Sequence, residues 1–195
     1  MSQRRFPQRV GGPPRRRQSL RRVFLALVPP EPVRERLHRL ARWAQHRVGG
    51  RLVPVDNLHL TVLFLGELDA PTLEYVIRGV DEVPLAPQLI ALEQLDYWPR
   101  AQILCAAGAP PPALLQNLHK GVRDRLKREL RLEQRPFMPH VTLLRKVVEL
   151  AALPMEPLSW QADELLLLES VRDGASVRYL PLECWSLASA RLSSR

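Results

Sequence analysis

Cysteine is scarce in this chain of 195 residues. Cys105 and Cys184 are the only two, they lie far apart, and neither belongs to a Cys-x-x-Cys pair. A pair so spaced argues against a disulfide framework and against a cysteine-rich zinc site. No cluster of histidine and cysteine has the spacing of metal ligands, and we expect no metal and no cofactor. We expect both thiols to be buried and reduced, in a cytoplasmic protein.

Long apolar runs are missing as well. The segment Ser19–Leu25 faintly resembles a twin-arginine export signal, but the apolar run that follows ends at Val28, before two prolines. A signal sequence needs roughly 7–15 apolar residues followed by a small-residue cleavage site. No stretch elsewhere is long enough to span a bilayer. The sequence therefore predicts a soluble protein without a membrane partner.

Acidic residues are absent from the first 22 positions, which contain eight arginines. This segment carries most of the formal charge of +9, because the rest of the chain has 21 basic and 20 acidic residues. Rich in proline, glycine and glutamine, residues 1–20 cannot bury enough apolar surface to fold, and we expect a disordered basic tail. It either attracts RNA phosphates or has no required role. Residues 21–195 are expected to form a single domain.

Hydrophobic periodicity predicts an α+β fold. Apolar runs or alternation indicate strands, and apolar spacing of three and four indicates helices. We expect strands at 23–28, 58–65, 88–95, 102–107, 140–148, 164–171 and 177–187, and helices at 31–47, 71–82 and 111–132. Each half of the chain then holds strands, an amphipathic helix and one histidine-bearing strand, which indicates two similar lobes around a cleft. The pairing order of the strands does not follow from this pattern.

Threonine and histidine are also rare, with three and five copies, yet two of the threonines follow a histidine by two positions. The segments are His59-Leu60-Thr61 and His140-Val141-Thr142. On a strand, residues i and i+2 face the same side, about 6.6 Å apart. Each segment therefore presents an imidazole and a hydroxyl to one face, and its middle residue to the core.

Two imidazoles and two hydroxyls suit a phosphate diester. In-line displacement needs one group to accept a proton from water and another to protonate the leaving oxygen. Histidine titrates near neutral pH, so one neutral and one protonated copy can coexist. Hydroxyls can donate hydrogen bonds to the non-bridging oxygens. A strained cyclic phosphodiester needs no metal for this chemistry, and no Gly-x-Ser-x-Gly nucleophile elbow points to another mechanism.

The surrounding residues resemble a known family. The stretches 54–66, PVDNLHLTVLFLG, and 135–145, RPFMPHVTLLR, are similar to the two signatures of the two-histidine phosphoesterases. Within this superfamily the chain most resembles the bacterial and archaeal RNA 2′,3′-cyclic phosphodiesterases, or LigT-like proteins. The resemblance covers nearly the whole chain from residue 21. It departs slightly at Asp56, where glutamate is more usual.

The resemblance implies a bilobal fold of two antiparallel-sheet lobes, with outer helices and both motif strands lining a central cleft. It implies hydrolysis of a terminal 2′,3′-cyclic phosphate to a 2′-phosphate. By motif order, His59 would be the general acid and His140 the general base, while Thr61 and Thr142 would hold the phosphate.

Three further residues are candidates for binding substrate. The family often has an arginine at the position of Arg145, but strict alternation would turn that side chain away from His140, so it needs a bend to reach the cleft. Tyr97 and Trp98 could stack on a base, or could simply pack at a strand turn. We expect His38, His46 and His119 to be surface or packing residues on helices.

Two alternatives to hydrolysis remain open. The same site run backwards would join RNA ends through a 2′-5′ linkage, although water at about 55 M favours hydrolysis. A binding module for RNA ends would keep the cleft without turnover. For either enzyme, the expected partners are RNA 3′ ends or 2′,3′-cyclic nucleotides, and the expected assembly is a monomer.

Overall fold

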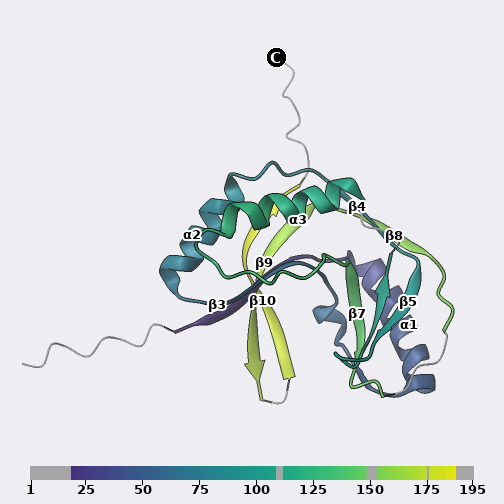
Figure 1. Ribbon diagram of the computed structural model, residues 1–195. Helices are drawn as coiled ribbons and strands as arrows, with labels where there is room; N and C mark the ends of the chain where they lie inside the picture. Colours follow the sequence, from purple (N-terminus) through teal and green to yellow (C-terminus); the bar gives the residue numbers. More distant parts are fainter. Residues whose placement is uncertain (1–18, 109–111, 149–152, 175, 188–195) are drawn as a thin grey trace, which may run out of the picture.

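The computed structural model describes residues 19–108, 112–148, 153–174 and 176–187. Within these ranges, three α-helices, a short 3₁₀ turn and ten strands follow one another (Figure 1). The helices are α1 (Glu31–Val48), α2 (Ala70–Asp81) and α3 (Ala113–Leu126), and the 3₁₀ turn is η1 (Val55–Asn57). The strands are β1 (Arg21–Leu27), β2 (Arg51–Leu52), β3 (Leu60–Leu68), β4 (Gln88–Leu92), β5 (Gln94–Trp98), β6 (Ile103–Ala107), β7 (His140–Arg145), β8 (Leu158–Ala162), β9 (Glu164–Asp173) and β10 (Ser176–Ser186).

Every strand pairing is antiparallel. Seven strands follow the order β10-β9-β1-β3-β7-β6-β5, and β2 adds to the free end of β7. β4 and β8 form a separate two-stranded sheet. β3 and β7 are registered at one pair only, Leu60 with Val141, so the large sheet divides there into two lobes. This confirms the predicted α+β fold with two antiparallel lobes, and shows that a single residue pair joins them.

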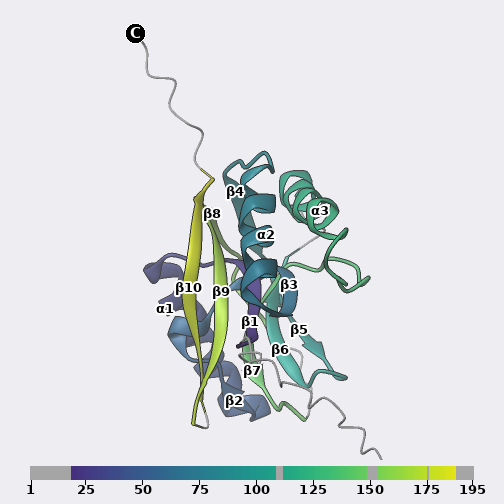
Figure 2. The same ribbon diagram turned by 90° about the vertical axis from the view of Figure 1, so that its left-hand side faces the viewer.

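Helices cover the lobes from outside. α2 and α3 lie side by side near β3, and α1 lies at the other end of the molecule beside β7 (Figures 1 and 2). The main core fills the space between helices and sheet and includes Leu37, Leu60, Leu115 and Val141, each at most 1% exposed. A smaller apolar cluster of Phe24, Ala26 and Leu168 lies apart from that core. Because Phe24 and Ala26 alternate with the core residues of β1, this smaller cluster marks the opposite face of the sheet.

Several local predictions differ from the structure. The strand expected at 88–95 is two strands in different sheets, because the chain changes partner at Glu93 and bonds there to the Ala107 carbonyl. The helix expected at 111–132 ends at Leu126 and continues in turns, although Leu130 remains buried. β2 and β8 were not predicted. Short strands such as these depend on their partners rather than on their own pattern.

One expectation about cysteine was wrong. Cys105 is buried as predicted, and its pKa is raised to about 12, mainly by burial. Cys184, however, is exposed, because it lies on β10, which is the edge strand of the large sheet. Both cysteines are free.

Most of the basic tail, residues 1–18, lies outside the described residues, so its predicted disorder stays a prediction. The assignment of residues 21–195 to one domain likewise stays a prediction. Among the described helices, none combines the length and apolarity that a membrane span requires.

Candidate active site

The two His-x-Thr segments cross at the junction of the lobes. Leu60 and Val141 are directly opposite each other and both are fully buried. Side chains alternate along a strand, and opposite residues share a face. The flanking histidines and threonines therefore all lie on the face away from the main core. His59 itself lies just before β3 rather than within it, but its spacing to Thr61 keeps the two on one side.

His59 is held by two hydrogen bonds. Its Nδ1 lies 2.7 Å from the carbonyl oxygen of Asn57, and its Nε2 lies 3.0 Å from the hydroxyl of Thr61. A carbonyl oxygen can only accept, so Nδ1 carries a proton and donates it. In the neutral ring, Nε2 is therefore the basic nitrogen and accepts from Thr61. Asn57 is in turn fixed by its amide, which donates to the Val177 carbonyl at 2.6 Å.

Aromatic rings surround His59 on the other sides. The rings of Phe24 and Tyr179 lie 4.9 and 5.0 Å from the imidazole and 4.9 Å from each other. Burial among these groups disfavours the charged ring and lowers the pKa of His59 to about 4. The hydrogen bond to Asn57 opposes this shift, while the charges of Arg145 and His140 add to it.

His140 repeats the arrangement. Its Nδ1 lies 2.8 Å from the Met138 carbonyl, two residues upstream, just as His59 bonds to Asn57. Nδ1 is again the donor, which leaves Nε2 available for proton transfer. The indole of Trp98 lies 4.3 Å from the imidazole, ring centre to ring centre. Burial lowers the pKa of His140 too, opposed by the Met138 bond and reinforced by the charge of Arg145.

The bend that Arg145 needs is present in β7. The register with β6 shifts by one residue between the pairs Cys105–Thr142 and Leu104–Leu144. Leu143 is the extra residue of this bulge, and both it and Leu144 are fully buried. The pair Ile103–Arg145 thus brings Arg145 back to the face of His140 and Thr142, since alternate β6 residues oppose all three.

The pairing of β5 with β6 places the two aromatic candidates, Tyr97 and Trp98, on opposite faces of the sheet. Trp98 is opposite Ile103, and so lies on the face of the motif residues. Tyr97 is opposite Leu104, packs against the main core, and donates its hydroxyl to the Val147 carbonyl at 3.0 Å. The structure brings Trp98 to the candidate site and turns Tyr97 away from it.

A cavity of about 670 Å³ opens beside the motif residues, with Thr61, His140 and Trp98 in its wall. It lies where β3 and β7 separate beyond their single shared pair. Its other lining residues come from β3, the β5–β6 turn, α3 and the segment before β7: Val62, Leu63, Phe64, Pro99, Arg100, His119, Glu133, Arg135, Pro136, Phe137 and Met138. Apolar walls with few polar groups are typical of a small-molecule or nucleotide pocket.

His119 was expected to be a surface or packing residue; it packs on Phe137 and also lines this cavity. Its Nδ1 lies 2.8 Å from the Val62 carbonyl, and its ring is stacked on Phe137 at 4.3 Å with 2° between the planes. Val62 adjoins Thr61, and Phe137 adjoins Met138, whose carbonyl orients His140. His119 therefore connects the two motifs through α3. A lone histidine on a helix gave no sequence signal for this role.

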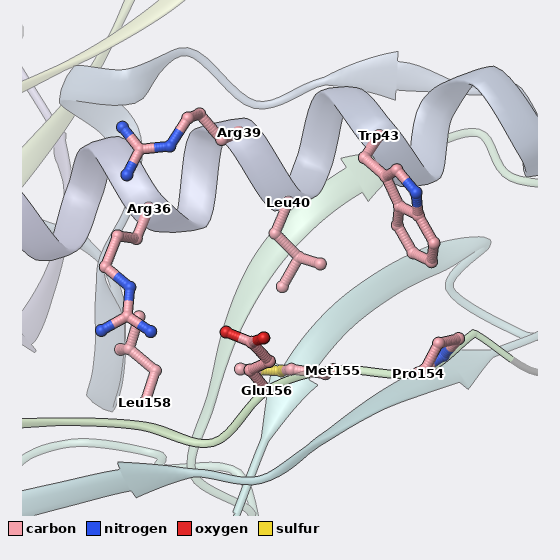
Figure 3. Close-up of a pocket in the computed structure, with 8 residues that line it drawn as sticks. All are labelled: Arg36, Arg39, Leu40, Trp43, Pro154, Met155, Glu156 and Leu158. Atoms are coloured by element: carbon pink, nitrogen blue, oxygen red, sulfur yellow. The ribbon is translucent and has the colours of Figure 1, made fainter.

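A second hollow, of about 620 Å³, lies between α1 and residues 154–158 (Figure 3). Arg36 and Arg39 line it from the helix and Glu156 from the opposite segment. It contains none of the motif residues. Nowhere in the described ranges do three or more histidine, cysteine, aspartate or glutamate side chains cluster in a way that could hold a metal ion.

Comparisons with known proteins agree with this geometry. A family model described as LigT like Phosphoesterase matches residues 27–104. The chain is 30% identical to the RNA 2′,3′-cyclic phosphodiesterase of Escherichia coli strain K12, over 85% of this chain and 96% of that protein. It is 31% identical to the protein of the same name from Thermus thermophilus, over 85% and 90% of the two chains.

Solved structures give the same relationship. The fold matches E. coli LigT in complex with 3′-AMP at a TM-score of 0.81 and 29% identity, covering 86% of this chain and 98% of that one. It matches the T. thermophilus protein TT0787 at a TM-score of 0.75 and 27% identity, covering 85% and 97%. With sequence identity and fold both shared over most of each chain, this protein belongs to the LigT-like phosphoesterase family.

Proposed function

We propose that this protein hydrolyses the 2′,3′-cyclic phosphate at an RNA 3′ end to a 2′-phosphate, without a metal ion. The observation that carries the proposal is the paired arrangement of His59 and His140. Each ring donates Nδ1–H to a carbonyl two residues upstream, which leaves its Nε2 for the reaction. The relatives named RNA 2′,3′-cyclic phosphodiesterase, and the LigT structure with 3′-AMP, support this substrate class.

The proposed reaction is a displacement at phosphorus. A water oxygen forms the new P–O bond as His140 Nε2 accepts its proton, and the bond to the 3′ oxygen breaks as His59 Nε2 donates a proton to it. Thr61 and Thr142 donate hydrogen bonds to the phosphate. When Thr61 turns its hydroxyl toward the phosphate, it releases His59 Nε2 from their 3.0 Å hydrogen bond.

As the proposed general acid, His59 must carry a proton on Nε2 when the reaction begins. Its pKa of about 4 makes the ring mostly neutral at pH 7, whereas a general acid must be protonated. A bound phosphate anion favours the imidazolium and raises this pKa. We therefore infer that His59 takes up its proton with the substrate, and that the assignment of acid and base holds for the substrate complex rather than for the free enzyme.

Two single substitutions test the activity itself. His59→Ala and His140→Ala should each lower the rate of 2′,3′-cyclic AMP hydrolysis by at least about 10²-fold, the usual contribution of a positioned acid or base. Circular dichroism should show both variants folded. Wild-type activity should persist in EDTA. Full activity of either variant would contradict the proposal, and loss of activity on chelation would indicate a metal mechanism.

A modified substrate tests which histidine is the acid. Sulfur in place of the 3′ oxygen is a leaving group that needs no protonation. The loss caused by His59→Ala should therefore shrink on the 3′-thio cyclic substrate, whereas the loss caused by His140→Ala should stay large. The opposite pattern would exchange the two roles. Identification of the product by mass spectrometry and comparison with standards gives the phosphate isomer.

We also propose that the physiological substrate is an RNA end rather than a free mononucleotide. Two of the motif residues, Thr61 and His140, line a cavity together with Phe64 and Met138, which are 55% exposed and able to contact a base. Arg100 and Arg135 are exposed residues of the same cavity. Incubation with cleaved tRNA halves separates hydrolysis from 2′-5′ joining. Tight binding of cyclic-ended RNA without any product would instead favour a binding module.

For the setting of the enzyme, we propose a cytoplasmic monomer. The two free thiols, one of them exposed, suit a reducing compartment. Apart from Phe64 and Met138, which line the same cavity, the large exposed apolar side chains of the described residues lie on separate elements, such as Leu89 on β4 and Leu180 on β10. Light scattering at micromolar concentration should give a mass near 22.3 kDa.

A further inference from the structure

The backbones of the two motif histidines are supported in different ways. His140 belongs to β7 and is paired with Ala107 of β6, so the sheet itself holds its backbone. His59 comes before β3, and the first paired residue of that strand is Leu60. The place of His59 therefore depends on the 3₁₀ turn η1 that precedes it rather than on a strand partner.

One buried side chain attaches η1 to a distant part of the chain. Asn57, the last residue of the turn, is 9% exposed, and its Nδ2 donates to the Val177 carbonyl of β10 at 2.6 Å. An ion pair of 3.7 Å also joins Asp56 of η1 to Arg34 of α1, but the aspartate side chain is 88% exposed. Exposed ion pairs contribute little to stability, so the hydrogen bond of Asn57 is the stronger of the two links.

Asn57 contacts β10 with its side chain and His59 with its backbone. Its carbonyl oxygen accepts the Nδ1–H of His59 at 2.7 Å. A rotation of Asn57 away from Val177 would move this carbonyl, and with it the direction in which Nε2 of His59 points. β10 also contacts the imidazole directly, because the ring of Tyr179 lies edge-on to it at 5.0 Å. The orientation of His59 is thus set by β10 through two contacts, one of them by way of Asn57.

The second motif has no counterpart of this amide. Met138 occupies the position of Asn57, two residues before the histidine, and its carbonyl accepts Nδ1–H of His140 in the same manner. Its side chain, however, is 55% exposed and has no hydrogen-bond donor. This difference matches the difference in backbone support, because His140 already has a strand partner.

We propose that Asn57 is a positioning residue for the general acid, and that its hydrogen bond to β10 directs Nε2 of His59 toward the leaving oxygen. The inference rests on the proposed function, because it assigns Asn57 to the proton donor and not to the base. Asn57 acts through His59 rather than on the substrate. A displacement of about 1 Å at a reacting group can lower a rate by about 10²-fold. Loss of the amide should therefore lower kcat and leave KM nearly unchanged.

Asn57→Leu tests this role, since leucine has nearly the same size but no hydrogen-bond donor. It should lower kcat on 2′,3′-cyclic AMP by about 10- to 100-fold. On the 3′-thio cyclic substrate, whose leaving group needs no protonation, most of this loss should disappear. Asn57→Ser, which keeps a shorter donor, should recover part of kcat. Gln88→Leu is the matched control: it also removes a buried amide that donates to a backbone carbonyl, but on β4, and should keep the wild-type kcat on both substrates.

Equal losses of kcat on the oxygen and sulfur substrates would overturn the proposal, because Asn57 would then support the fold in general and not the proton donor. An unchanged kcat of folded Asn57→Leu would overturn it as well. If Asn57→Leu does not fold, Asn57→Ser provides the same comparison between the two substrates, with a smaller loss expected on the oxygen substrate alone.

Titration of the histidine rings by nuclear magnetic resonance keeps the test independent of turnover. The titratable or charged groups around His59 are Tyr179, His140 and Arg145. In Asn57→Leu the pKa of His59 should rise from about 4 toward 6.5, because water reaches the released ring, while the pKa of His140 changes far less. An unshifted pKa of His59 would contradict the proposal. If wild type hydrolysed neither substrate, the proposed function would fail, and this titration would still decide whether Asn57 positions His59.

Discussion

The proposed chemistry of the site depends on one nitrogen of each histidine. Backbone carbonyls of Asn57 and Met138 accept from the two Nδ1 atoms, and this leaves Nε2 of both rings for the proposed proton transfers. A carbonyl acceptor carries no charge, unlike the carboxylate that often orients a catalytic histidine. The hydrogen bonds to these carbonyls raise the pKa values of the two rings, but less than burial lowers them.

The lowered pKa values predict a displaced pH profile. In the proposed mechanism the active form of the free enzyme has one proton on the histidine pair, so kcat/KM should be bell-shaped between two apparent pKa values that belong to the pair. With both lowered, the maximum should lie below pH 6.5. Bound phosphate raises both, and the maximum of kcat should lie at higher pH.

Initial rates on 2′,3′-cyclic AMP from pH 4 to 9 check this displacement. Arg145→Ala should move the kcat/KM maximum upward, because loss of a nearby cation raises the pKa of an imidazole. A kcat/KM that keeps rising through pH 7.5 in wild type would contradict the prediction.

At the scale of elements, the site depends on how α3 joins β3 to the segment before β7. Val62 has no partner residue on β1, because the pairing of β1 with β3 passes from Ala26–Thr61 directly to Leu25–Leu63. Val62 also lies beyond Leu60, the one residue of β3 that is paired with β7. Its buried carbonyl takes the N–H of His119. Phe137, stacked on the same ring, is three residues from His140.

Loss of the His119 contacts should lower both the stability of the protein and the rate of hydrolysis. His119→Ala leaves the buried Val62 carbonyl without its donor, a loss of about 1–3 kcal/mol, or about 2–10 °C in Tm for a chain of this size. We expect kcat to fall more than KM rises, because the substitution removes support from His140 but leaves the groups that contact the substrate in place. His119→Asn, which can keep the donor, should restore part of both.

His46→Ala is the control for that pair of variants, since His46 is an exposed histidine in the last turn of α1. It should leave the Tm and kcat of wild type. A folded His119→Ala variant with unchanged Tm and kcat would show that α3 does not support the motifs.

At the scale of the whole molecule, the buried histidines link folding to pH. His59, His119 and His140 all have a pKa lowered from 6.5, chiefly by burial. Below pH 6.5 the unfolded chain binds protons that the folded chain does not, so stability falls as pH falls. For His59 this loss runs from about pH 6.5 to about 4 and amounts to about 3 kcal/mol when complete.

Urea denaturation at pH 7.5 and pH 5 measures this dependence. The free energy of unfolding should be lower at pH 5, and His59→Gln, which cannot titrate, should show a smaller difference between the two pH values. If His59→Gln retained the whole wild-type difference, His59 would not be the source of the linkage. Above about pH 7.5 these histidines should contribute no further dependence.

What the sequence could predict follows from local rules. The two-residue spacing in His59-Leu60-Thr61 and His140-Val141-Thr142 fixes a shared face whatever the strand's partners are, and the same periodicity predicted most elements within a few residues. It could not predict β2, whose two residues form a strand only because Gly50 lets them approach β7. Nor could it predict that residues 88–95 divide between two sheets.

The sequence by itself thus determined the fold class, the two motifs and the groups each presents. Only the tertiary structure decided that Arg145 returns to the face of His140 and Thr142, that Trp98 reaches this face while Tyr97 does not, and that Arg51 lies opposite Arg145. The physical reason is that the face to which each side chain of one strand points is set by backbone geometry within a few residues. Register, bulges and burial arise between segments far apart in the chain, and these set which groups meet and how readily they hold a proton.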